Sequence, residues 1–250
     1  MMITVWLISL ALKDVSVVDV AWGLGFAMVA WVTYFARTTS EGNPLLPLLT
    51  TIWGLRLSGY LAWRKAGRLE DYRYRAMRER HPRSFPVLSL LTVFALQGAL
   101  MWIVALPLQT VDPAGAPSVV LTIIGVLLWG VGLLFESIGD WQLTGFKSDP
   151  TNSDKVMDRG FWHYTRHPNY FGDSLVWWGL YVVSLASGGQ WWSVIGPAVM
   201  CVLLRRVSGV TLLEKSLRCR KEGYAEYVAR TNAFFPWWPK HTQQESDGGA

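Results

Sequence analysis

Long apolar stretches separated by short polar links are the feature that most constrains the fold of this chain. The stretches cover residues 1–12, 17–36, 44–63, 85–108, 118–146, 168–187 and 190–207. Most approach the ~20 residues that a helix needs to cross a bilayer, and the first is shorter. The chain is also 51% hydrophobic and only 16% charged, and it holds 15 Trp, a residue favoured at membrane interfaces. These features predict an all-α, polytopic integral membrane protein with about seven transmembrane helices.

The charged residues of the links predict the topology. Eight Lys or Arg lie between Arg64 and Arg83, and eight more lie between Arg205 and Lys240. The links around Asp112 and at residues 188–190 contain none. The positive-inside rule places the basic links and the C-terminus in the cytoplasm, and counting back over seven spans places the N-terminus outside. We expect one membrane domain over residues 1–240, followed by a disordered polar tail over 241–250.

Composition also argues against several other classes of protein. The net charge of +5 comes from clustered links and not from a basic stripe on a soluble domain, so we expect no nucleic-acid partner. Cys201 and Cys219 are too few and too far apart for a thiolate metal site or a disulfide framework, and we expect no metal. The N-terminus lacks the basic region and the small-residue cleavage site of a signal peptide.

Residues 160–173 concentrate polar side chains between two apolar stretches. Pro168 suits the first position of a helix, because it has no N–H to leave unpaired and its ring presets φ. Arg166 and His167 then lie just before a helix N-terminus, where free N–H groups and the helix dipole favour anions. The segment is either an anion-binding cradle for a phosphate or carboxylate, or an ordinary basic loop at the membrane edge.

Four ionisable residues fall inside the apparent spans, where each is costly unless it is paired or faces a polar cavity. They are Asp19, Arg56, Glu136 and Asp140. The spacing of Glu136, Asp140 and Lys147 puts all three on one face of a regular helix. Asn169 and Asp173 repeat this pattern on the next apolar stretch. We expect one hydrophilic pocket that opens to the cytoplasm, and the alternative is a structural ion pair between helices.

A second polar cluster lies in the C-terminal stretch from Glu214 to Pro236. This stretch is too charged to span the membrane, but its Leu and Tyr residues would give an interfacial helix an apolar face. Arg218 and Tyr227 are its candidate binding residues. The alternative is a surface helix with solvated charges.

Residues 160–173 together with Glu214–Pro236 resemble the C-terminal signature of the steroid 5α-reductase superfamily. Within it the chain looks most like a bacterial branch of undefined function. That likeness rests on Asp19-Val-Ala-Trp-Gly-Leu-Gly-Phe, Trp53-Gly-Leu-Arg56, Glu70-Asp-Tyr-Arg-Tyr and Leu213-Glu214-Lys215. Relatives of this fold include NADPH-dependent steroid and sterol reductases, and isoprenylcysteine carboxyl methyltransferases that use S-adenosylmethionine. The Arg-His-Pro element is common to all of them, so it does not identify the reaction.

The resemblance implies a reductase in the bacterial inner membrane that uses NADPH to reduce an activated C=C bond in a steroid-like or other lipid substrate. Residues 1–108 would lie on the substrate side, and residues 118–240 would bind the cofactor from the cytoplasm. The implied cofactor-binding residues are Glu136, Asp140, Lys147, Tyr164, Arg166, His167, Asn169, Tyr170, Asp173, Glu214, Arg218 and Tyr227.

Arg56 would stabilise the developing oxyanion, or Asp19 would do so if burial keeps its carboxyl protonated. Two alternatives remain open. The chain is an S-adenosylmethionine-dependent methyltransferase of a lipid or isoprenyl carboxyl group, or a lipid-binding protein without catalytic activity.

Overall fold

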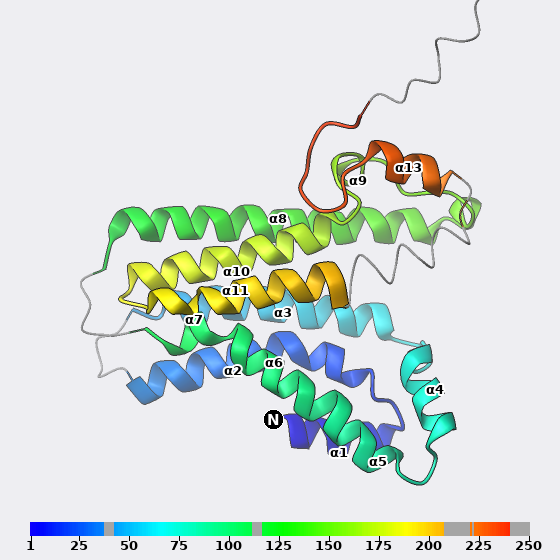
Figure 1. The fold of residues 1–250 in the computed structure, drawn as a ribbon, viewed down its shortest axis with the longest axis horizontal. Coiled ribbons are helices and arrows are strands. Elements are labelled where there is room, and N and C mark those ends of the chain that lie inside the picture. The colour runs from blue at the N-terminus through cyan, green and yellow to red at the C-terminus, as the bar shows by residue number, and fades with distance from the viewer. Residues whose placement is uncertain (38–42, 112–116, 208–220, 222, 241–250) are drawn as a thin grey trace, which may run out of the picture. The chain divides into compact units, whose positions relative to one another are not determined.

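A computed structural model describes residues 1–37, 43–111, 117–207, 221 and 223–240 (Figure 1). The first half contains α1 (Met2–Leu12), α2 (Val17–Arg37), α3 (Leu45–Lys65), α4 (Tyr72–Arg80), α5 (Phe85–Ser89), η1 (Leu90–Ala95), α6 (Leu96–Val104) and α7 (Leu106–Gln109). The second half contains α8 (Val119–Ser148), η2 (Pro150–Asn152), α9 (Phe161–Tyr164), α10 (Pro168–Ala186), η3 (Trp191–Val194), α11 (Ile195–Val202), η4 (Leu203–Val207) and α13 (Tyr224–Arg230). All regular elements in this part of the chain are helical, which confirms the all-α prediction.

The described helices indicate a membrane protein. Four helical stretches are long and apolar enough to cross a bilayer, namely α2, α3, α8 and the stretch Phe85–Val104. The helix α1 is apolar but has only 11 residues. The helix α10 has 19 residues, and its first turns carry Asn169 and Asp173. Seven spans and the orientation of the termini therefore stay predictions.

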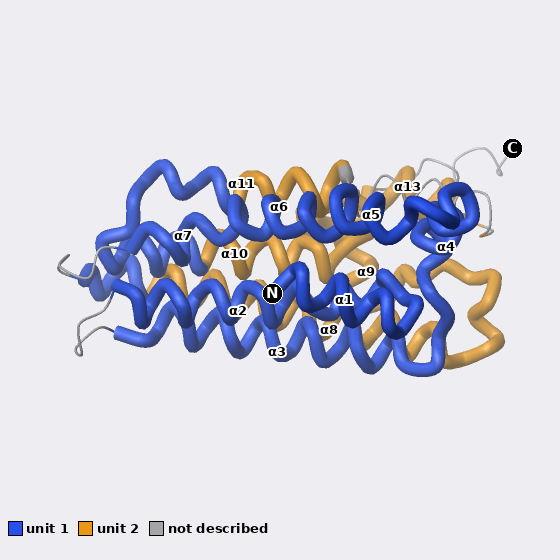
Figure 2. The backbone as a smooth tube through the Cα atoms, turned by 90° about the horizontal axis from the view of Figure 1, so that it is seen from below, with its two compact units in different colours: residues 1–122, 180–196 blue, residues 123–179, 197–250 orange. Residues whose placement is uncertain are grey.

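The chain divides into two compact units (Figure 2). Unit 1 consists of residues 1–122 and 180–196, and unit 2 consists of residues 123–179 and 197–250. Each unit contains one of the polar clusters described below. The single membrane domain over residues 1–240 stays a prediction.

In unit 1, α2 and α3 cross with their backbones in contact. A Cβ atom on Gly23 would collide with the carbonyl oxygen of Gly54, so glycine is required at this crossing. Beside it, the Ser58 hydroxyl donates to the carbonyl oxygen of Val20 at 2.6 Å and accepts from the backbone N–H of Leu24 at 3.2 Å. Close backbone approach with added side-chain hydrogen bonds is how helices associate without a hydrophobic driving force in lipid.

In unit 2, α8 and α10 meet along glycines that recur every seven residues. They are Gly125, Gly132 and Gly139 on α8, and Gly172 and Gly179 on α10. A Cβ atom on Gly132 would lie 2.6 Å from the backbone N of Val176 and 2.7 Å from the carbonyl oxygen of Gly172. Gly139 lies against Pro168 and Asn169 in the same way. These contacts hold the first turns of α10 against the polar end of α8.

Candidate functional site

Unit 2 contains a buried cluster of carboxyl and amide groups at the start of α10. Glu136 and Asp140 on α8 are 3% and 5% exposed. The Asn169 side-chain N–H donates to Oδ1 of Asp140 at 3.1 Å. Oδ1 of Asn169 is buried and accepts no hydrogen bond from the described residues. A buried amide oxygen that lacks a donor carries an unfavourable free energy, which a ligand N–H or O–H would relieve.

Pro168 is the first residue of α10, as its sequence context predicts. The preceding residue, His167, is 4% exposed and stacks on Tyr170 with the ring planes 4° apart. Asp173 is half-buried one turn after Asn169. Lys147 is exposed at the end of α8, whereas Glu136 and Asp140, which the sequence puts on the same face, are buried.

Arg166 contacts the C-terminal segment of the chain. Its Nη1 donates to the carbonyl oxygens of Val228 and Thr231, at 3.0 and 2.5 Å, and its backbone N–H donates to the carbonyl oxygen of Asn232 at 2.9 Å. These carbonyls lie at the C-terminus of α13, where a cation is favoured by the helix dipole. Arg166 therefore has a structural role in this unit, and its predicted contact with an anion stays a prediction.

Two predicted tyrosines also join the loop of α9 to the C-terminal segment. The Tyr227 hydroxyl is buried and donates to the carbonyl oxygen of Trp162 at 2.5 Å. Burial raises the pKa of this phenol, which stays protonated at neutral pH. The Tyr164 ring packs edge-to-face against Trp238 at 5.3 Å. Glu214 and Arg218, the other C-terminal candidates, lie outside the described residues.

Unit 1 contains a hydrogen-bonded chain that the sequence analysis missed. The Trp22 indole N–H donates to Oε1 of Gln97 at 2.5 Å, and Nε2 of Gln97 donates to the Tyr74 hydroxyl at 3.5 Å. Tyr74 lies on α4 and is 8% exposed. Burial, and next the nearby Asp19 carboxylate, raise the pKa of Tyr74 to about 12. Because the hydroxyl oxygen accepts from Gln97, its own proton is not used in that hydrogen bond.

The two predicted catalytic residues lie on different helices of unit 1. Asp19, in the first turn of α2, interacts electrostatically with Arg73 and Asp71 as well as with Tyr74. Arg56, in the middle of α3, lies over the ring of Tyr60 with 5.4 Å between the guanidinium carbon and the ring centroid. The structure thus groups Asp19 with α4, and the proposed role of either residue stays a prediction.

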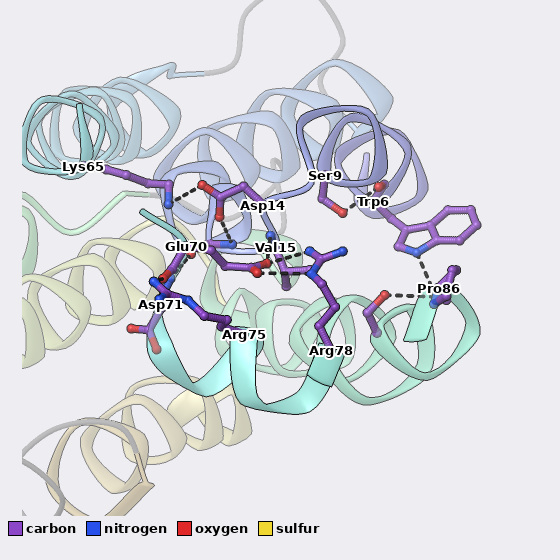
Figure 3. Close-up of polar contacts among 12 residues, drawn as sticks. Trp6, Ser9, Asp14, Val15, Lys65, Glu70, Asp71, Arg75, Arg78 and Pro86 are labelled. Carbon is purple, nitrogen blue, oxygen red and sulfur yellow. Dashed lines mark hydrogen bonds and ion pairs between the residues drawn. The ribbon is translucent and has the colours of Figure 1, made fainter. Parts of the chain in front are cut away.

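Charged side chains connect the links that lead into α2 and α4 (Figure 3). Asp14 pairs with Lys65 at 2.6 Å, and Glu70 accepts from the backbone N–H of Val15 and pairs with Arg78, both at 2.8 Å. Burial raises the pKa of Asp14, but hydrogen bonds from Lys65 and from Ser16 outweigh it and lower the pKa overall. These contacts join the link before α2 to the link before α4, and so hold Tyr74 in place.

The described residues show no group of three or more His, Cys, Asp and Glu side chains that could hold a metal ion. The polar groups of both clusters are hydrogen-bond donors and acceptors.

Comparison with protein families gives one match. Residues 5–231 match the family described as "Protein of unknown function (DUF1295)". The chain belongs to this family. The family is associated with steroid 5α-reductase-like membrane proteins. No curated protein and no solved structure matches the chain.

Proposed function

We propose that the chain is a membrane-embedded, NADPH-dependent reductase of an activated C=C bond in a lipid or steroid-like molecule. The observation that carries this proposal is the buried Oδ1 of Asn169, held beside Asp140 and without a donor in the described part of the chain. A nucleotide cofactor offers amide, amine and ribose hydroxyl donors to such an acceptor. Glu136 and Asp140 are further buried acceptors on α8, and the donor that Oδ1 of Asn169 lacks is of a kind that this cofactor carries.

Cations on this unit would meet the cofactor phosphates. Lys147 is exposed at the end of α8, and the Arg166 guanidinium has five N–H donors, so a phosphate would add to its contacts with carbonyl oxygens. His167 and Tyr170 form a stacked pair that would fix the shape of the site beside Asn169.

We propose Tyr74 as the acid of this reaction on the chemistry of its hydroxyl. When bound, NADPH supplies a hydride for the β-carbon of an enone, and negative charge then develops on the carbonyl oxygen. Tyr74 would donate its O–H to that oxygen, because Gln97 donates to the hydroxyl oxygen and so leaves the proton available. A phenol with a raised pKa stays protonated until this charge develops, and its proton then passes to the oxygen to give an enol. The α-carbon of the enol would take one proton from water while the O–H proton returns to Tyr74, so that the saturated ketone forms and the phenol is restored.

Ligand binding to the detergent-purified protein tests this proposal. We expect NADPH at 100 times its dissociation constant to stabilise the protein by about 2.7 kcal/mol in thermal unfolding. The substitution Asn169→Leu removes the buried acceptor and should abolish this stabilisation. The matched control is Thr231→Val, because it also removes a buried oxygen without a hydrogen-bond partner from unit 2 and should leave binding unchanged.

S-adenosylmethionine and NADH serve as comparison ligands. Stabilisation by S-adenosylmethionine and not by NADPH would overturn the proposal in favour of a methyltransferase. Absence of stabilisation by all three ligands would favour a lipid-binding protein without a cofactor.

A further inference from the structure

The segment of residues 231–240 is held firmly against the rest of unit 2. The Thr165 hydroxyl donates to the carbonyl oxygen of Phe234 at 2.9 Å, and the backbone N–H of Trp237 donates to the carbonyl oxygen of Tyr164 at 3.0 Å. The backbone N–H of Lys240 donates to the carbonyl oxygen of Arg230 at 2.9 Å. The segment therefore has a defined path beside α9 and α13 (Figure 1).

Large aromatic side chains of this segment are nevertheless left uncovered. Phe235, Trp237 and Trp238 are 63%, 70% and 71% exposed. An indole ring can bury 150–250 Å² of surface, so a fixed segment that exposes two of them has a large apolar area available for contact.

The position of this segment along α8, compared with the thickness of a bilayer, indicates which partner contacts its exposed aromatic side chains. The Trp162 indole N–H donates to the carbonyl oxygen of Gly139, and the backbone N–H of Phe161 donates to Oε1 of Gln142, both at 3.0 Å. At ~1.5 Å per residue, the helix from Val119 to Gly139 is about 30 Å long, which is the thickness of the hydrocarbon core of a bilayer. The loop that holds the segment thus contacts α8 where this helix leaves the hydrocarbon.

The charges at this level are mainly positive. Arg159 and Lys240 are exposed, and Asp158 is paired with Arg230 at 2.5 Å. Exposed cations beside Trp rings match the headgroup layer of a membrane that contains anionic lipids.

We propose that residues 231–240 form an interfacial anchor, in which Trp237 and Trp238 insert into the lipid headgroup layer and hold the loop of residues 158–167 at the membrane surface. This inference does not depend on the proposed reductase activity. It concerns the bilayer as the partner of this surface.

Fluorescence quenching in vesicles tests the anchor. The full-length chain with Cys201→Ala and Cys219→Ala is reconstituted in phosphatidylcholine vesicles containing phosphatidylglycerol, and single cysteines carry a small environment-sensitive dye. The labelled variants are Pro239→Cys in the segment, Leu127→Cys on the exposed apolar face of α8, and Asp154→Cys beyond the end of α8. The quenchers are iodide in water, a nitroxide on the lipid headgroup and a nitroxide deep on the acyl chain.

We expect the dye at residue 239 to be quenched several-fold more by the headgroup nitroxide than the dye at residue 154. The acyl-chain nitroxide should quench most strongly at residue 127, and iodide at residue 154. The pair Trp237→Ser and Trp238→Ser should shift the dye at residue 239 toward iodide quenching, whereas Trp63→Ser, at another exposed Trp, should not. Iodide quenching at residue 239 equal to that at residue 154 would overturn the proposal and indicate a surface that faces water.

Discussion

Tyr74 is the residue whose chemistry the surrounding structure controls most directly. Its hydroxyl accepts from Gln97, whose amide is oriented in turn by the Trp22 indole N–H. If the chain is a reductase, Tyr74→Phe should lower kcat by 10²–10⁴-fold with little change in KM, because the ring and its packing remain while the proton donor is lost. Steady-state kinetics with an enone substrate measures this.

Tyr72 provides the matched control on the same helix. It is 76% exposed, so Tyr72→Phe removes the same hydroxyl from a solvated position and should leave kcat unchanged. Equal activity of Tyr74→Phe and the unsubstituted protein would show that Tyr74 is not the acid.

At the scale of elements, the crossing of α8 and α10 depends on glycine. Gly132→Ala places a methyl group 2.6 Å from the backbone N of Val176, and should destabilise the protein by about 1–3 kcal/mol as the helices separate. Thermal unfolding in detergent measures the change.

Gly130 is the control for this substitution, because nothing lies within 4 Å of a Cβ atom at this position of the same helix. Gly130→Ala should be neutral or stabilise by up to ~1 kcal/mol through its higher helix propensity. Similar effects of the two substitutions would contradict close backbone contact at Gly132.

The same elements explain which parts of the site can be predicted from sequence. Pro168 identifies the start of α10 because its fixed φ and missing N–H are local properties. Glu136 and Asp140 share a face because the helix between them is regular. Local patterns of this kind need no knowledge of what packs nearby.

The parts that were missed depend on contacts between distant segments. Arg166 binds carbonyl oxygens more than 60 residues away, and no local signal predicts that the chain returns to it. Tyr74 lies in a helix of charged residues, and neighbours such as Asp71 and Arg73 are typical of a solvated face. The pattern Glu70-Asp-Tyr-Arg-Tyr includes this tyrosine, but its burial follows from packing against other elements.

For the whole molecule, the distribution of charge predicts which ends of the helices face the cytoplasm. Arg80 on α4 belongs to a basic link, whereas Gln190 belongs to a link without Lys or Arg, and both are exposed. In intact cells, a membrane-impermeant maleimide should label Gln190→Cys and not Arg80→Cys, in a background with Cys201 and Cys219 replaced by Ala.

Permeabilised cells provide the control, because both cysteines should then react. Labelling of Arg80→Cys in intact cells would reverse the topology, and with it the cytoplasmic position expected for the Asn169 cluster.

The π-helical turn η1 limits how this chain can change in length. It lies directly before α6, whose first two residues are Leu96 and Gln97. Each residue of an α-helix turns the following side chain by ~100°, so deleting one residue from Leu90–Ala95 would rotate Gln97 away from Trp22. Homologous chains that keep the hydrogen bond between Trp22 and Gln97 should therefore tolerate substitutions in η1 but not single-residue deletions.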